Sequence, residues 1–417
     1  MSEIQAFDLR APGILADPYP LFARLRADDP VHWSAALKGW VLTRYDDVKT
    51  CMTDKRFSAD RISPFRDALP EAERASISDL VRDLGHWMVF TDPPLHTRLR
   101  GLANQAFTSS SIERMTPDIE QLVDRLIDGF IERGETDLIR DFAFPLPVMV
   151  IAEMLGVTLH DITEFKRWSD DLAAFVGSAQ MTPDKRQRAQ AAVEALEALF
   201  GELMADRRSA PREDMISRLI AASDEDGGLS DEQLVATCVL LLFAGHETTM
   251  NLIGNGFLAL ARNPGELTKV ANEKGLVISA VEEALRYEGP GLALTRVALE
   301  SIEMHSKVLQ PGDRIFAMVA AANRDPAEFA DPERLDVTGQ PNRHLTFGHG
   351  IHFCMGAPLA RLEGRIAYAA LAGRLAQLEL LDPDPEWIDS LSLRGVRSLK
   401  LGFTPAPVSG APVRGVA

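Results

Sequence analysis

From Phe347 to Arg361 the chain reads FGHGIHFCMGAPLAR, with Cys354 near its centre. Three glycines in the nine positions from Gly348 to Gly356 allow the backbone to fold tightly around a ligand. Pro358 is typical of the first turn of a helix, so we expect a helix to begin just beyond Gly356. Cys354 then lies before a helix N-terminus, where free amides and the helix dipole stabilise a thiolate. Such a thiolate is a suitable axial ligand for haem iron.

The residues of this loop also leave three other interpretations open. Cys354 can be an ordinary buried cysteine in a glycine-rich turn. A zinc site can combine Cys354 with His344, His349 and His352, although their spacing matches no familiar zinc finger. A phosphate-binding loop can also precede a helix, but the chain shows neither a GxxxxGK[ST] nor a GxGxxG pattern here.

A second decisive feature is a long apolar segment over 231–261. Ser230 and Gln233 form the pattern of a capping box, and Arg262-Asn263-Pro264 ends the helix. A helix over this range is about 46 Å long and must cross the body of the protein. Its centre, AGHETT at 244–249, is polar. It is either a tolerated polar turn, or a widened turn where Gly245 lets a ligand approach and Thr248 bonds back to the Ala244 carbonyl or faces a cavity.

The rest of the chain predicts a mainly α protein with a minor β part. Apolar residues recur at helical spacing over 189–207, at Val193, Leu196, Phe200 and Leu203. Short β-like runs occur at 39–43, 297–303 and 314–320. No repeat, low-complexity tract or Ser/Gly linker divides the chain, so we expect 1–417 to be a single domain without a fused reductase.

Composition limits the classes of function. The 417 residues contain 44 Lys and Arg against 61 Asp and Glu, and the net charge of −17 argues against nucleic-acid binding. Three scattered cysteines fit a reducing cytoplasm rather than a disulfide framework. The first ten residues lack the pattern of a signal peptide, and the uncharged apolar run 234–245 is too short to span a membrane. We therefore expect a soluble cytoplasmic protein that does not contact a membrane.

Taken together, these motifs resemble those of the cytochrome P-450 superfamily of haem-thiolate monooxygenases, in its soluble bacterial group. The pattern Phe347-Gly348-x-Gly350-x-His352-x-Cys354-x-Gly356 resembles the family's haem-binding signature. The AGHETT turn is similar to its oxygen-activating helix motif, and DPPLHTRLR at 92–100 and NRDP at 323–326 also fit. The resemblance runs in family order from about Pro18 to Phe403, and it implies a haem between the long central helix and the helix after the cysteine.

The resemblance also implies roles for individual residues. Cys354 is the axial ligand of the iron of haem b, and Glu247 and Thr248 organise water and deliver protons to the O2 co-substrate. The remaining cofactor-binding residues implied are His96, Arg100, Arg296 and His352 at the propionates, with Phe347, Gly348 and Ala244. Of three Glu-x-x-Arg pairs, only Glu283/Arg286 lies between the oxygen motif and the cysteine. With Arg334 it resembles the family's buried structural network.

The resemblance further implies the partners. Electrons come from a separate iron–sulfur ferredoxin and an NAD(P)H-dependent reductase, which dock on the cysteine side of the haem; the candidate basic residues are Arg98, Arg343, Arg361 and Arg365. The chain is expected to be a monomer. The alternatives are a peroxide-using or rearranging haem-thiolate enzyme, and a haem sensor or carrier.

The substrate is expected to be a largely apolar small molecule that is hydroxylated or epoxidised. The segments expected at its pocket are 62–90, 170–181, 240–244, 292–294 and 393–396, with a mobile lid near Phe175-Val176-Gly177. The single residues expected to line it are Val89, Leu241, Ala244, Leu292, Ala293 and Leu294.

Overall fold

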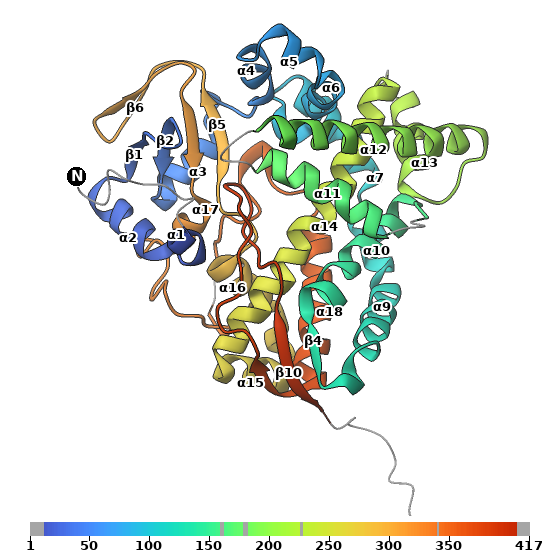
Figure 1. Cartoon of the computed structure of the whole chain (residues 1–417), viewed down its shortest axis with the longest axis vertical. Helices are drawn as coiled ribbons and strands as arrows, with labels where there is room; N and C mark the ends of the chain where they lie inside the picture. The colour runs from blue at the N-terminus through green and yellow to red at the C-terminus, as the bar shows by residue number, and fades with distance from the viewer. Residues whose placement is uncertain (1–11, 159–161, 178–181, 226–227, 340–341, 407–417) are drawn as a thin grey trace, which may run out of the picture.

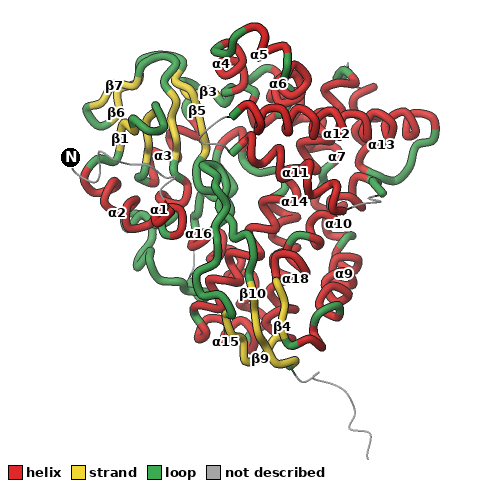
Figure 2. The backbone as a smooth tube through the Cα atoms, viewed as in Figure 1, coloured by secondary structure: helices red, strands yellow, loops and turns green. Residues whose placement is uncertain are grey.

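The computed structural model describes residues 12–158, 162–177, 182–225, 228–339 and 342–406. Most of this chain is helical, and the strands gather into small sheets at the periphery (Figures 1 and 2). The longer helices are α2 (Tyr19–Asp28), α3 (Tyr45–Thr53), α6 (Ser78–Gly85), α7 (Leu95–Ala106), α9 (Thr116–Asp128), α10 (Pro145–Leu155), α11 (Ile162–Val176), α12 (Pro183–Ser209), α13 (Met215–Glu225), α14 (Asp231–Arg262), α15 (Pro264–Asn272), α16 (Val277–Glu288) and α18 (Ala357–Arg374).

Several shorter helical turns connect these elements. They are α1 (Pro12–Ala16), α4 (Ile62–Asp67), α5 (Glu71–Ala75), η2 (Met88–Phe90), α8 (Ser109–Arg114), η3 (Ile131–Arg133), η4 (Ile139–Ala143), η5 (Lys274–Leu276), α17 (Val319–Ala322) and η6 (Gly350–His352).

The strands form three separate sheets. The largest has the order β1-β2-β8-β5-β3, in which only the β2–β8 pair is parallel. The other two have the orders β4-β10-β9 and β6-β7. The strands are β1 (Val31–Ser34), β2 (Gly39–Leu42), β3 (Phe57–Ser58), β4 (Glu135–Asp137), β5 (Leu294–Ala298), β6 (Ile302–Met304), β7 (Lys307–Leu309), β8 (Arg314–Ala317), β9 (Leu375–Leu380) and β10 (Lys400–Pro405).

The long helix predicted from the sequence is α14, and its boundaries follow from its ends. The Ser230 hydroxyl accepts from the Gln233 amide, and the Gln233 side chain accepts from the Ser230 amide, which completes the capping box. Asn263 and Pro264 end the helix after 32 residues, about 48 Å. The predicted range was therefore one residue short.

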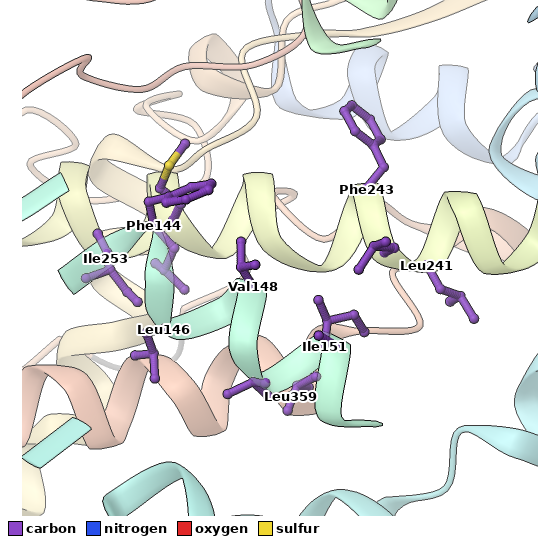
Figure 3. Close-up of a cluster of buried hydrophobic side chains, with 14 of the residues drawn as sticks. Phe144, Leu146, Val148, Ile151, Leu241, Phe243, Ile253 and Leu359 are labelled. Atoms are coloured by element: carbon purple, nitrogen blue, oxygen red, sulfur yellow. The ribbon is translucent and has the colours of Figure 1, made fainter. Parts of the chain in front are cut away.

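Helix α14 is the centre of the hydrophobic core and packs against α10, α12, α16 and α18. Figure 3 shows Val148 and Ile151 of α10 reaching toward α14, with Leu359 of α18 on the far side of α10. Phe243 points to the opposite side of α14. Within the part of the chain that the structure describes, α14 is the one helix long and apolar enough to span a membrane, but 83% of its most apolar window is buried inside the protein. It is a core helix.

The structure corrects two of the β predictions. The run 297–303 is not one strand, because β5 ends at Ala298 and β6 begins at Ile302. The run 314–320 is a strand only as far as Ala317, and α17 begins at Val319. The three alanines after Val319 have high helix propensity, which outweighs the strand pattern there. The helical prediction over 189–207 is confirmed, since that range lies within α12.

Candidate functional site

The loop before α18 folds tightly around Cys354. Gly348 and Gly350 have φ of 73° and 72°, in the left-handed region that favours glycine. A side chain on Gly350 would also lie 3.2 Å from the Met52 carbonyl of α3. The Cys354 amide donates to the Phe347 carbonyl at 2.8 Å, which closes the loop. Helix α18 begins at Ala357, as predicted.

The Cys354 thiol receives two amide donors at the start of α18. The backbone N–H groups of Gly356 and Ala357 hydrogen-bond to the sulfur, and Arg100 also favours its thiolate. Burial nevertheless outweighs these contributions and raises the pKa of Cys354 above its usual value. A cation bound at the sulfur reverses this balance, because a metal-coordinated thiol is deprotonated. The sulfur environment therefore fits an iron ligand.

Close to this loop, four cationic or imidazole side chains act on one another, namely His96, Arg100, Arg296 and His352. The rings of His96 on α7 and His352 on η6 lie 4.2 Å apart, and Nε2 of the buried His96 has no hydrogen-bond partner. Arg296 on β5 is buried and has the carbonyl of its neighbour Thr295 as a hydrogen-bond acceptor. Three segments that are far apart in the sequence thus contribute side chains to one polar position.

The electrostatics of this group point to an anionic ligand. Burial, Arg296 and His96 lower the pKa of His352 to about 3, and burial and Arg100 lower the pKa of His96. Asp92 is the acidic side chain whose charge acts on His352, but its oxygens already accept hydrogen bonds from the Ser58 hydroxyl and the Ala59 amide. Donors without a carboxylate of their own fit the propionates of a haem held at Cys354.

The aromatic ring of Phe347 packs beside the cysteine loop. The Arg361 guanidinium lies 4.5 Å above this ring and forms an ion pair with Glu282 at 2.7 Å. His344 also contacts Glu282, at 3.2 Å. Because of these partners, the pKa of Glu282 is lowered to about 2. The sequence analysis did not identify Glu282, since one more glutamate on an amphipathic helix gives no signal.

The zinc interpretation of the loop receives no support. Of the three histidines it requires, His344 is bonded to Glu282 and His352 stacks against His96. No group of three or more His, Cys, Asp or Glu side chains with metal-binding geometry occurs among the described residues.

The polar turn of α14 is helical throughout, which favours the tolerated polar turn over a widened turn at Gly245. The hydroxyl of Thr248 donates to the Ala244 carbonyl at 2.9 Å, and that of Thr249 donates to the Gly245 carbonyl at 3.0 Å. The space for a side chain at Gly245 is filled by Ile151 of α10, at 3.0 Å. Gly245 is therefore required for the close packing of α10 against α14. The predicted bond from Thr248 back to Ala244 is present.

Glu247 is a buried carboxyl group on this turn. Burial, together with Asp170, raises its pKa to about 7, although Lys166 and a 3.5 Å bond from Asn251 oppose the shift. A group with a pKa near 7 can hold and release a proton under neutral conditions. Glu247 and Thr248 therefore have the chemistry expected of a proton-delivering pair.

The buried His246 supports the same turn. Its Nδ1 lies 2.8 Å from the Leu242 carbonyl and therefore carries the proton, which leaves Nε2 to accept from the Ser169 hydroxyl at 2.7 Å. Burial lowers the pKa of His246 to about 4. The neutral ring ties α14 to α11, where Lys166 and Asp170 lie. The sequence signal for this role of His246 is a histidine inside an apolar helix.

The structural network around Glu283 differs from the prediction. Arg286 forms a bidentate pair with Glu283 at 2.7 and 2.8 Å, and both are buried. The side chain of Arg334 is exposed, because Arg286 binds its carbonyl oxygen at 2.9 Å and the side chain turns outward. The amide of Asn342 donates to Glu283 at 3.0 Å instead. Asn342, not Arg334, is the third side chain of this network.

The residues expected at a substrate pocket separate into two groups. Val89 is 41% exposed and Ala244 is partly buried on α14, where Leu241 joins the core. Leu292 and Ala293 pack instead in an apolar cluster with Tyr19, Phe22 and Leu25 of α2. Leu294 packs against the core under the five-stranded sheet. Leu292 and Ala293 therefore bind α2 to the body of the protein, and their position at the substrate stays a prediction.

The remaining pocket and lid segments are only partly described. Residues 178–181 of the range 170–181 lie outside the described residues. In the described part, the Leu391 amide donates to the Gly177 carbonyl at 2.9 Å, so the end of the predicted lid contacts the C-terminal loop.

The basic residues expected at the docking face have different environments. Arg98 is exposed and donates to Gln233, and Arg343 is exposed at 3.6 Å from Glu328. Arg365 is partly buried and donates to the Arg361 carbonyl. Since Arg361 is committed to Glu282, Arg98 and Arg343 are the two exposed cations of the predicted set.

Comparisons with known proteins agree with this geometry. The family model described as Cytochrome P-450 matches residues 41–376. The cytochrome P-450 monooxygenase PikC of Streptomyces venezuelae is 40% identical over 399 residues, covering 93% of this chain and 91% of its own. The vitamin D(3) 25-hydroxylase of Pseudonocardia autotrophica is 40% identical over 395 residues, covering 93% and 94%.

Solved structures show the same fold. The myxobacterial cytochrome P-450 CYP267B1, in complex with myristic acid, has a TM-score of 0.86 and 40% identity, covering 95% of this chain and 98% of that one. CYP109E1 of Bacillus megaterium, in complex with testosterone, has a TM-score of 0.84 and 32% identity, covering 94% and 99%.

Proposed function

The chain belongs to the cytochrome P-450 family and is a haem b monooxygenase, and on this basis we propose that it inserts one oxygen atom from O2 into a largely apolar small molecule, by hydroxylation or epoxidation. The observation that supports this most is the pairing of Cys354 in its amide-lined loop with Glu247 and Thr248 on α14. Names of relatives support the substrate class, since vitamin D(3), testosterone and myristic acid are all largely apolar.

Each residue of the site has a role in this proposal. Haem supplies the iron at which O2 is activated. Cys354 would hold the iron, and His96, Arg100, Arg296 and His352 would bind the propionates. Phe347, Gly348 and Ala244 provide packing surface around the cofactor. The Thr248 hydroxyl and the Glu247 carboxyl position water and move protons, and the neutral His246 holds this turn in place.

The proposal extends to partners and location. Electrons come from a separate iron–sulfur ferredoxin and its NAD(P)H-dependent reductase, and the donor docks beside the cysteine loop, where Arg98 and Arg343 are exposed. Acidic ferredoxins are attracted to a local positive surface even on a protein of net charge −17. The chain acts as a single-domain monomer in the cytoplasm.

Turnover with isotopically labelled O2 tests the proposal. The purified protein, a surrogate ferredoxin and its reductase are supplied with NAD(P)H and an apolar substrate that shifts the Soret band. One labelled oxygen atom per product is expected. Product formed only from peroxide, or rearranged product without label, would instead indicate one of the other haem-thiolate activities. Absence of turnover with every electron donor would indicate a haem sensor or carrier.

A further inference from the structure

Arg61 is a partly buried cation whose charge has little compensation among the described residues. It precedes α4, and its guanidinium lies 4.4 Å from the centre of the Phe90 ring of η2. Its Nη2 donates to the carbonyl of Val176, the last residue of α11, at 3.3 Å. A guanidinium has five N–H donors. Within the described ranges, Arg61 forms no salt bridge with an acidic side chain, so most of its donors and its charge remain available.

The like charge of Arg296 makes the position of the Arg61 guanidinium less favourable still. Burial and the like charge of Arg296 together lower the pKa of Arg61 to about 10, and the group remains charged near pH 7. Asp60 does not compensate it, because Oδ1 of Asp60 accepts from the amides of Ile62 and Ser63 at the start of α4. Arg296 is the buried cation assigned to a haem propionate, so the charge still without an anion is that of the partly buried Arg61, which favours a negatively charged ligand beside it.

The surroundings of Arg61 connect it with the reaction site. The Phe90 ring stacks on Trp87 at 5.8 Å, and Trp87 contacts Phe243 of α14 at 5.4 Å. Phe243 immediately precedes Ala244, the first residue of the AGHETT turn. The guanidinium and the reacting turn therefore lie at the two ends of one row of aromatic rings. A ligand with a charged end at Arg61 and an apolar body extending toward α14 matches this order.

We propose that Arg61 anchors a carboxylate at one end of an otherwise apolar substrate. This inference deepens the proposed function and rests on it. A planar carboxylate accepts two parallel bonds from a guanidinium, and the Phe90 ring and the Val176 carbonyl hold that guanidinium in a fixed orientation. Arg61 is thus a residue that determines substrate specificity.

Binding titrations of the haem-loaded protein test this proposal. Unbranched carboxylates from decanoate to hexadecanoate are compared with the alcohols of the same lengths, using the Soret shift as the readout. In the wild-type protein the carboxylates bind more tightly. Arg61→Gln is expected to weaken their binding about tenfold to a hundredfold while changing alcohol affinity less than about twofold. Arg61→Lys should retain part of the preference.

Arg66→Gln is the matched control, because Arg66 lies on α4, which Arg61 precedes, and its side chain is 43% exposed and paired with Asp67. It should leave both ligand series unchanged. Equal weakening of carboxylate and alcohol binding by Arg61→Gln would show that Arg61 has only a structural role, linking α4 to α11. Loss of haem from the variant would assign Arg61 to a propionate. Wild-type protein that binds none of the carboxylates, or binds alcohols more tightly, would overturn the inference as well.

The reduced carbon-monoxide spectrum, recorded on the same samples, separates this failure from failure of the proposed function. A normal thiolate spectrum with no preference for acids refutes only the anchor at Arg61. An abnormal spectrum in the wild-type protein refutes the haem-thiolate assignment itself.

Discussion

Replacing Glu247 by Gln should stabilise the protein at alkaline pH much more than at acidic pH. The Glu247 carboxyl is buried, and its pKa in the folded protein is about 7 against 4.5 for the ordinary group. Between these values the folded state binds more protons than the unfolded state, so stability falls as pH rises from 4.5 toward 7. Glutamine keeps the shape of the group and removes its titration.

The magnitude follows from the shift. A displacement of 2.5 units, from 4.5 to about 7, corresponds to about 3 kcal/mol once both states are ionised. Part of this destabilisation is already present at about pH 5. The increase in the free energy of unfolding caused by Glu247→Gln should therefore be larger at about pH 8 than at about pH 5, by roughly 2 to 3 kcal/mol.

Denaturant unfolding of the two proteins at both pH values measures this difference. The titration of His246 also contributes, because its pKa of about 4 makes the folded state lose stability below its ordinary value of 6.5 and its Nε2 lies 3.8 Å from Glu247. An equal effect of the substitution at both pH values would show that Glu247 is ionised in the folded protein. The proposed exchange of protons at this carboxyl would then be wrong.

Three further predictions concern other parts of the site. Thr248→Ala should keep haem and substrate binding but divert electrons to peroxide, which lowers the product formed per NAD(P)H consumed. The control Thr249→Ala removes the neighbouring hydroxyl, which makes the same type of bond, and should stay coupled. Equal coupling in both variants would mean that Thr248 does not deliver protons. Asn342→Ala should lower the free energy of unfolding by about 1 to 3 kcal/mol, because Glu283 loses a hydrogen-bond donor. Arg334→Ala should change the free energy of unfolding by less than about 0.5 kcal/mol. A larger loss for Arg334→Ala than for Asn342→Ala would show that the Arg334 side chain belongs to the network. Charge reversal at Arg98 and Arg343 should slow reduction by ferredoxin and flatten its salt dependence without altering substrate-induced Soret shifts, and an unchanged rate would place the docking face elsewhere.

The sequence predicted those elements whose signal is local. The capping box at Ser230 and the proline after Gly356 define the starts of α14 and α18, because helix ends are determined by hydrogen bonds within a few residues. Gly348 and Gly350 of the cysteine loop likewise have the left-handed conformation that glycine adopts easily.

Features that depend on long-range packing could not be predicted in this way. The sequence left two interpretations of Gly245 open, and neither included its close packing against Ile151, 94 positions away on α10. The packing of Leu292 and Ala293 against α2 likewise depends on tertiary structure, which their apolar character alone does not specify. The exchange of Arg334 for Asn342 depends on which atom of each residue faces Glu283, and a motif does not contain that information.

The central claim is that Cys354 is the thiolate ligand of the haem iron, and the reduced carbon-monoxide spectrum of Cys354→Ala tests it most directly. The wild-type protein is expected to show the long-wavelength Soret band after which the family is named. The band should be absent from Cys354→Ala, while Cys51→Ala, which alters a cysteine buried on α3, should retain it. Retention of the normal band in Cys354→Ala would contradict the account.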